Sequence, residues 1–191
     1  MSSNINLNYL VNLKAYKTSS RVEFLTFLSF AAIAFFVPLI LPASQLVVGS
    51  IVNFMLVMAA INIAGWKKII PLIILPSVAS AFLGYLFGDI TMFLIYLVPF
   101  IWVGNSILLI AFKFFYVAKK ENYFSVLLRA AFLKALFLFI AAVILINFSV
   151  IPSALLAAMS IFQLATALIG GLLAYAANLA YRRYFKGSAV N

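Results

Sequence analysis

The segment Leu46-Val-Val-Gly-Ser-Ile-Val-Asn-Phe-Met-Leu-Val-Met-Ala-Ala-Ile-Asn-Ile-Ala64 decides the fold class of this chain. Its 19 residues carry no charge, and about 20 apolar residues are enough for a helix to cross a bilayer. The next residues, Gly65-Trp66-Lys67-Lys68, combine a turn signal, an interfacial aromatic ring and two positive charges. We therefore predict a transmembrane helix that ends at a cytoplasmic turn.

The rest of the chain has the same character. Of its 191 residues, 68% are hydrophobic and 8% are charged, whereas soluble domains contain about 25% charged residues. We predict an all-α integral membrane protein, a compact bundle of six transmembrane helices, without a separate soluble catalytic or nucleotide-binding domain. The predicted spans cover residues 24–41, 46–64, 69–87, 90–112, 126–148 and 153–181.

The positive charges predict how these spans are oriented. The chain has 13 Lys and Arg residues but only three Asp and Glu residues, a net charge of +10. All but one of the 13 lie in residues 1–23, the 67–68 turn, the 113–129 segment or the 182–191 tail, on one side of a six-span bundle. Because cytoplasmic loops collect Lys and Arg, we expect both termini in the cytoplasm, a multi-pass protein of the cell membrane and no nucleic-acid partner.

The segments outside the spans are short. Residues 1–23 are expected to form a cytoplasmic N-terminal segment with a short interfacial helix around Leu10, and residues 182–191 a basic cytoplasmic tail. Between the fourth and fifth spans, residues 113–123 are expected to form the only substantial loop.

Catalytic chemistry has few residues to draw on. The chain contains no Cys and no His, which excludes thiolate nucleophiles, His bases and the usual transition-metal sites. Its three carboxylates, Glu23, Asp89 and Glu121, lie far apart in the sequence, and none falls inside a predicted span. We therefore predict that the protein is not an enzyme, has no cofactor or metal, and is not a stand-alone proton pump.

Polar side chains inside the spans are the candidates for function. Lys134 is the one cation that the charge pattern does not explain. Either it faces the bundle, with Asn105 and Gln163 as partners and the capacity to attract a carboxylate or phosphate, or its stem extends to the cytoplasmic headgroups beside Arg129. The amides, including Asn53, have two interpretations as well: ligand contacts, or hydrogen bonds that join helices.

Small residues recur every four positions in two spans. Ser80, Gly84 and Gly88 repeat in this way near the end of the third span, and Gly170 and Ala174 do so in the sixth. Small residues in register let helix backbones approach closely in lipid. We expect these positions to pack helices within one chain rather than to form a dimer interface.

Three short motifs carry a resemblance to a known family. They are Gly49-Ser-Ile-Val-Asn53, Ile74-Leu-Pro-Ser-Val78 and Pro99-Phe-Ile-Trp-Val-Gly-Asn105. With six spans they resemble the substrate-binding S components of energy-coupling factor transporters. The resemblance implies a subunit that captures a small, vitamin-like metabolite from the extracellular side. It also implies a scaffold transmembrane subunit and two cytoplasmic ATPases as partners, and this chain has no ATP-binding signature of its own.

The resemblance also implies where ligand and partner would bind. In this family the ligand pocket lies in the outer half of the membrane. Together with Asn105 and Lys134, which lie deeper in the spans, the expected ligand-binding residues are Gln45, Asn53, Asp89, Tyr96, Asn105, Lys134, Asn147 and Gln163. In the first span, small residues are expected to face the scaffold, although they lack the Ala-x-x-x-Ala spacing of many family members: Ser29, Ala31, Ala32 and Ala34.

Two other functions fit the same composition. A structural or accessory membrane protein would use its cationic inner face to organise anionic lipid or a partner, and its amides would only join helices. A channel or facilitator would need a continuous polar stripe, yet the first and third spans offer mainly Ser and Thr.

Overall fold

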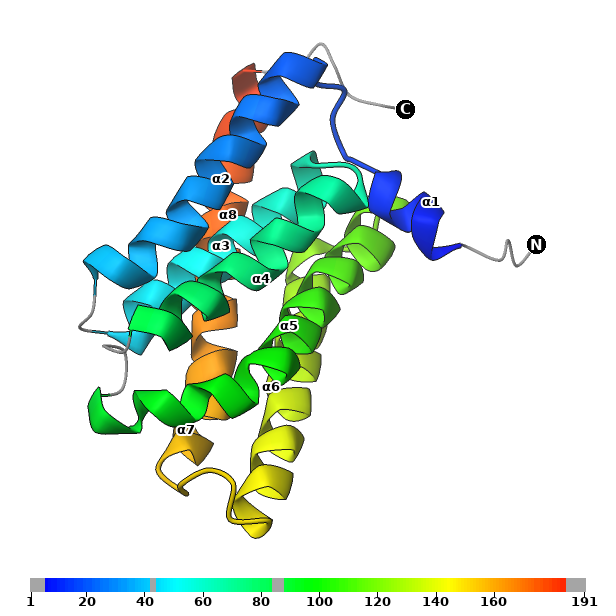
Figure 1. Cartoon of the computed structure of the whole chain (residues 1–191). Helices are drawn as coiled ribbons and strands as arrows, with labels where there is room; N and C mark the ends of the chain where they lie inside the picture. Colours follow the sequence, from blue (N-terminus) through cyan, green and yellow to red (C-terminus); the bar gives the residue numbers. More distant parts are fainter. Residues whose placement is uncertain (1–5, 42–43, 84–87, 185–191) are drawn as a thin grey trace.

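The computed structural model describes residues 6–41, 44–83 and 88–184, and in this part of the chain the regular structure is helical (Figure 1). In chain order the α-helices are α1 (Leu7–Asn12), α2 (Ser20–Ile40), α3 (Gln45–Asn62), α4 (Trp66–Leu83), α5 (Leu94–Ala111), α6 (Tyr123–Asn147), α7 (Leu155–Met159) and α8 (Ile161–Tyr184). A 3-10 helix, η1 (Gly88–Phe93), precedes α5, and a π-helix, η2 (Phe112–Ala118), continues it.

Several of these helices have the length and composition of membrane spans. Among the described residues five segments qualify: Ser20–Ile40, Gln45–Asn62, Ile90–Ala118, Tyr123–Asn147 and Leu155–Ala180. The all-helical class and the presence of helices able to cross a membrane are therefore confirmed. The third predicted span corresponds to α4, which begins with Trp66-Lys67-Lys68 and is not among the five. The short N-terminal helix expected around Leu10 is present as α1.

The structure differs from the sequence prediction at three connections. The segment expected to be a loop after residue 112 is largely the π-helix η2, whose i→i+5 bonding absorbs an extra residue per turn. The span predicted over 153–181 is broken at Ser160, whose φ of −121° and ψ of −89° separate α7 from α8. The span predicted to start at residue 90 begins as the 3-10 helix η1.

Side-chain caps explain where two helices begin. Ser19 accepts a hydrogen bond from the Val22 amide, so α2 starts at residue 20 rather than 24. Asn122 accepts from the amides of Phe124 and Ser125, so α6 starts three residues before the predicted boundary.

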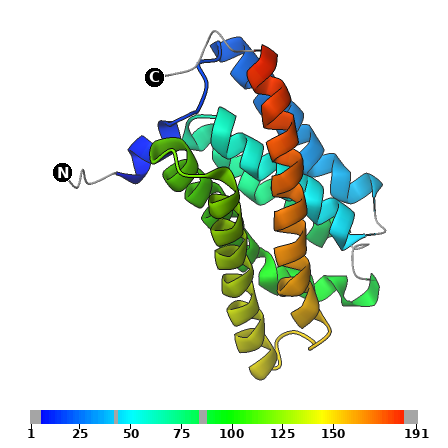
Figure 2. The ribbon, with the colours of Figure 1, turned by 180° about the vertical axis from the view of Figure 1, so that it is seen from behind.

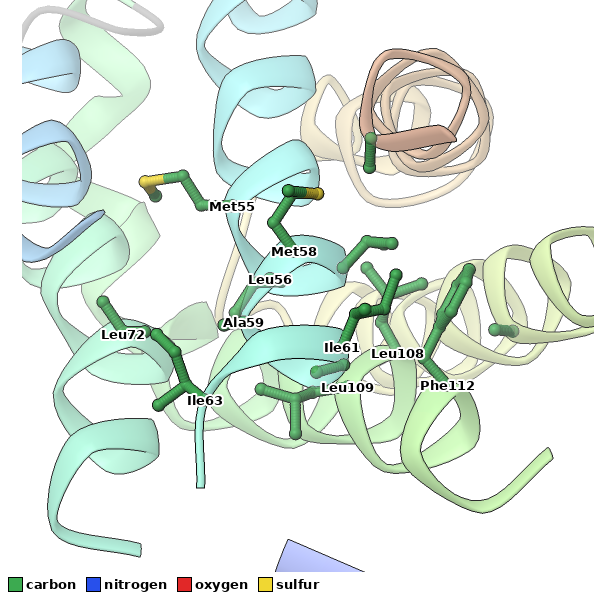
Figure 3. Close-up of a cluster of buried hydrophobic side chains, with 14 of the residues drawn as sticks. Met55, Leu56, Met58, Ala59, Ile61, Ile63, Leu72, Leu108, Leu109 and Phe112 are labelled. Atoms are coloured by element: carbon green, nitrogen blue, oxygen red, sulfur yellow. The ribbon is translucent and has the colours of Figure 1, made fainter. Parts of the chain in front are cut away.

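The central helix of the bundle is α3. Of the residues in its membrane-length window, 67% are buried, against 17% for α2, which is therefore peripheral. The partner with the most extensive contact is α8, which runs along α3 on the face seen in Figure 2. The side chains in the C-terminal half of α3 interlock with those of α4, α5 and η2 (Figure 3): Met55, Leu56, Ile61, Leu72, Leu108 and Phe112.

A second apolar cluster forms at the opposite end of α5 and α6, together with α7. On α5, Asn105 lies between Leu97 of the second cluster and Leu108 of the first. On α6, Lys134 lies in the same way between Ala130 of the first cluster and Leu138 of the second. The buried polar residues are thus placed where the two apolar clusters meet.

The N-terminal segment is fixed to the bundle by a second buried lysine. Lys113 of η2 has no exposed surface and donates hydrogen bonds to the backbone oxygens of Leu13 (2.5 Å) and Ile63 (2.9 Å). Gly65, whose φ of +91° favours glycine, makes the turn from α3 to α4 and donates its amide to the Val11 oxygen. Glu23 at the start of α2 forms ion pairs with two further lysines of this region, Lys14 (2.7 Å) and Lys68 (2.6 Å).

Candidate ligand-binding pocket

A pocket lies between α3, α4, α5, α6 and α8, near the end of the bundle where α3, α5 and α8 begin. Gln45 and Leu94, the first residues of α3 and α5, line it, as does Gln163 near the start of α8. It contains about 520 Å³ of empty space including its open mouth, of which about 70 Å³ admits the centre of a water molecule. That part is larger than the roughly 10–15 Å³ that a single water needs, so the pocket has room for a small molecule.

The lining combines polar and apolar side chains, as small-molecule sites usually do. The polar residues are Gln45, Asn53, Ser77, Ser80, Asn105, Lys134 and Gln163. The apolar ones include Val48, Val52, Leu94, Ile101 and Met159.

Lys134 is the charged residue of the pocket. Its side chain is 2% exposed, and its Nζ donates to Oδ1 of Asn53 (2.6 Å) and to Oδ1 of Asn105 (2.8 Å). Of the two alternatives for this lysine, the structure shows the inward one, in which the ammonium faces the bundle. Of the two partners that the sequence suggested, Asn105 is bonded to it and Gln163 is not; Asn53 takes the second place.

Neighbouring helices orient both asparagines toward the lysine. The Asn53 amide nitrogen donates to Oγ1 of Thr166 on α8 (3.1 Å), and that of Asn105 donates to the Ile73 oxygen on α4 (3.1 Å). Because each nitrogen is engaged with another helix, each oxygen is turned toward Lys134. The resulting network joins α3, α4, α5, α6 and α8 around one ammonium group.

The positive charge of Lys134 has no carboxylate partner among the described side chains. Glu23 is paired with Lys14 and Lys68, and Glu121 with Arg129. The side chain of Asp89, the third acid of the chain, lies outside the description. The two amide oxygens therefore provide the hydrogen bonds that the ammonium needs but do not neutralise its charge.

Two glutamines leave polar atoms available near the mouth. The Gln163 side chain is half-buried and forms no hydrogen bond with the described residues. Gln45 uses its amide nitrogen to bond the Ala158 oxygen (2.7 Å), which ties the start of α3 to α7, and its amide oxygen accepts no hydrogen bond from the described residues. On α4, the Ser77 hydroxyl accepts from the indole nitrogen of Trp102 (2.7 Å) and so holds that ring beside the pocket.

The structure brings together five of the eight residues expected to bind ligand: Gln45, Asn53, Asn105, Lys134 and Gln163. Tyr96 does not line the pocket, because it is 53% exposed on a face of α5 other than that of buried Leu97. Asn147 does not line it either, since it is the exposed last residue of α6 and bonds the Val143 oxygen of its own helix. Asp89 lies in η1, with its side chain outside the description.

The predicted packing residues fall in two places. Gly170 and Ala174 are buried where α8 meets α3, and Ser80 is buried and also lines the pocket. Gly88 begins η1, after the end of α4, and Gly84 lies outside the described residues.

The residues expected to face a scaffold subunit divide as well. Ser29 and Ala32 are exposed on α2, and Ala31 is half-buried. Ala34 has no exposed surface because it packs into the apolar core of its own chain, so it is unavailable to a partner.

Sequence reasoning missed two polar groups. Ser77 lies three residues before Ser80 on α4, a spacing that places both on one helix face and would have shown that they act together. No sequence signal indicates that Lys113 is buried. A lysine at the end of a span and next to further lysines is normally interpreted as part of a cytoplasmic, solvent-exposed loop.

The polar groups of the pocket can hold a small molecule through hydrogen bonds. The pocket contains one amine, four amides and hydroxyls, but no described carboxylate that would serve as a base or acid. Among the described residues no group of three or more acidic side chains is placed to hold a metal ion. In comparisons with protein-family models, with curated proteins and with solved structures, no match to this chain was found.

Proposed function

We propose that this protein is a membrane-embedded solute-binding subunit of an importer, which captures a small metabolite in the pocket around Lys134. The observation that carries the proposal is a buried ammonium group, held by two amides from different helices, beside space for a small molecule. Polar and charged groups inside the membrane are costly, and they usually mark a substrate path or binding site.

The proposed topology has six spans, with α4 as the sixth, and both termini in the cytoplasm. Lys14, Lys68 and Lys113 meet around the α3–α4 turn, and Lys119 follows at the end of η2, so these cations share one end of the bundle. The pocket lies toward the opposite end. By the positive-inside rule that opposite end is extracellular.

Energy would come from partners. The resemblance to S components of energy-coupling factor transporters implies a scaffold transmembrane subunit and two cytoplasmic ATPases in the cell membrane. The exposed small residues Ser29 and Ala32 on peripheral α2 offer a surface for the scaffold. The described pocket holds no acid that would couple transport to protons, which favours an external source of energy.

One observation favours a structural role as the second candidate. The side-chain nitrogens and oxygens of Asn53 and Asn105 all form hydrogen bonds to other helices. Amides do the same when they only stabilise a membrane bundle. That role does not explain Gln163, whose side chain lines the pocket without a hydrogen bond to any described residue.

Native mass spectrometry of the full chain, purified alone from its own cells and released from nanodiscs, tests the proposal. We expect one small molecule per chain, and pull-down of the chain from membranes should recover an ATPase. A chain with no bound molecule other than lipid would favour the structural role. Solute uptake that persists after deletion of the recovered ATPase would contradict the importer assignment.

A further inference from the structure

The hydrogen bonds of Lys134 define what the pocket still lacks. An ammonium group has three donors, and two are used by Asn53 and Asn105. Lys134 lines the pocket, and its third donor has no partner among the described residues. Burying a charge costs least when the charge is paired and its hydrogen bonds are satisfied, so an acceptor with a negative charge suits the third donor best.

The geometry points to a carboxylate of the bound molecule as that partner: the pocket recognises a small monocarboxylic acid, whose carboxylate accepts the third N–H of Lys134. This inference rests on the proposed solute-binding function and names the class of solute. The carboxylate of the ligand would form an ion pair with the Lys134 ammonium. The oxygens of Asn53 and Asn105 fix the direction in which the third N–H of that ammonium points.

Charge arithmetic favours a single negative charge on the ligand. Lys134 is the only cation among the described residues that line the pocket, so a monoanion gives a neutral site. A doubly charged phosphate would leave one net negative charge in a low-dielectric region, which is costly.

The rest of the lining limits the body of the acid. Val48, Val52 and Ile101 offer apolar contact. Near the mouth, the Gln163 amide has no hydrogen-bond partner among the described residues and is available for one polar group of the ligand. Since the enclosed part of the pocket is only about 70 Å³, it favours a compact acid from solution over the long acyl chain of a fatty acid from lipid.

The test uses the full chain in nanodiscs and matched pairs of probes. Butyrate, hexanoate and benzoate are compared with butyramide, hexanamide and benzamide, which have nearly the same shape without the charge. Inorganic phosphate and octadecanoate represent a dianion and a lipid acid. Affinity is measured by titration calorimetry, and the unfolding temperature is recorded in parallel.

We expect at least one short acid to bind once per chain and at least tenfold more tightly than its amide. Lys134→Gln should lower the affinity for that acid at least tenfold, whereas Lys119→Gln, at an exposed lysine of η2's C-terminal end, should leave it unchanged. If Lys134→Gln does not fold, the comparison of acid with amide in the natural chain decides the question alone.

Four results would overturn the inference: no probe acid binds, an amide binds as tightly as its acid, phosphate or octadecanoate binds more tightly than every short acid, or folded Lys134→Gln keeps the natural affinity. A neutral or cationic molecule found by native mass spectrometry would also overturn it while leaving the solute-binding function in place. The absence of any bound molecule there would instead remove the proposed function.

Discussion

Gly170 of α8 lies so close to Asn53 of α3 that a methyl group on Gly170 would stand 2.8 Å from the Asn53 Cβ. The same methyl would be 2.5 Å from the Ser50 oxygen and 2.6 Å from the Phe54 amide nitrogen. These are backbone atoms, which cannot move aside without separating the two helices. Gly170 therefore sets how closely α3 and α8 pack. It also sets the position of Asn53, whose oxygen accepts a hydrogen bond from Lys134.

Gly170→Ala is expected to lower both stability and binding. Forcing α8 away from α3 should cost about 1–3 kcal/mol, more than alanine regains through helix propensity. It should also displace Asn53 and weaken the affinity for the co-purified molecule. Thermal unfolding and titration of the purified variant measure the two effects.

Gly171→Ala is the matched control for this variant. The three atoms nearest to a methyl group there all belong to the side chain of Leu127 rather than to the backbone, so a side-chain shift can relieve the contact without separating the helices. Its loss of stability should be the smaller of the two, and its binding should be unchanged. Equal losses in both variants would contradict the assignment of Gly170 as the contact that positions the site.

Replacing the buried polar network tests whether its purpose is stability or binding. Lys134→Met leaves the oxygens of Asn53 and Asn105 without their donor, at a cost of about 1–3 kcal/mol for each unsatisfied group. Changing the two asparagines to Leu in the same chain removes the orphaned oxygens, so the unfolding temperature should recover. Ligand binding should stay lost. If the triple variant stayed as unstable as the single one, the network would not be separable from folding.

Lys113 is expected to hold the N-terminal segment in place. Lys113→Met removes two hydrogen bonds from a charged donor to the Leu13 and Ile63 oxygens, each worth about 1.5–3 kcal/mol. We expect a lower unfolding temperature and faster proteolysis between α1 and α2. Lys119→Met serves as the control, because the Nζ of this exposed lysine lies over two rings, 4.4 Å from the centre of Phe114 and 5.5 Å from that of Phe115. Similar effects of the two changes would show that charge, not burial, is what matters.

The proposed orientation can be tested in a chain that contains no cysteine. Two exposed positions at opposite ends of α6 can each carry a single cysteine. Ser149 lies between α6 and α7, and Lys120 lies between η2 and α6. A membrane-impermeant maleimide should label the cysteine at position 149 on intact cells and the one at position 120 only after permeabilisation. The reverse pattern would place the pocket toward the cytoplasm.

The sequence was sufficient for the helical class and for most of the polar residues, because long uncharged runs and isolated polar groups in them are strong signals. It was not sufficient for the face on which a residue lies. The helices α5 and α6 are apolar on nearly all sides, so nothing in the pattern distinguishes exposed Tyr96 from buried Leu97. The break at Ser160 has no proline or glycine next to it, so the sequence around it carries no breaker signal.

An experimental structure of the chain with its co-purified molecule is the most direct test of the central claim. The account predicts density for one compact molecule in the pocket, with an acidic group within hydrogen-bonding distance of Lys134 Nζ and the two asparagines still bonded to it. A pocket that holds only ordered water or a lipid chain, with Lys134 paired to a carboxylate of the protein itself, would contradict it.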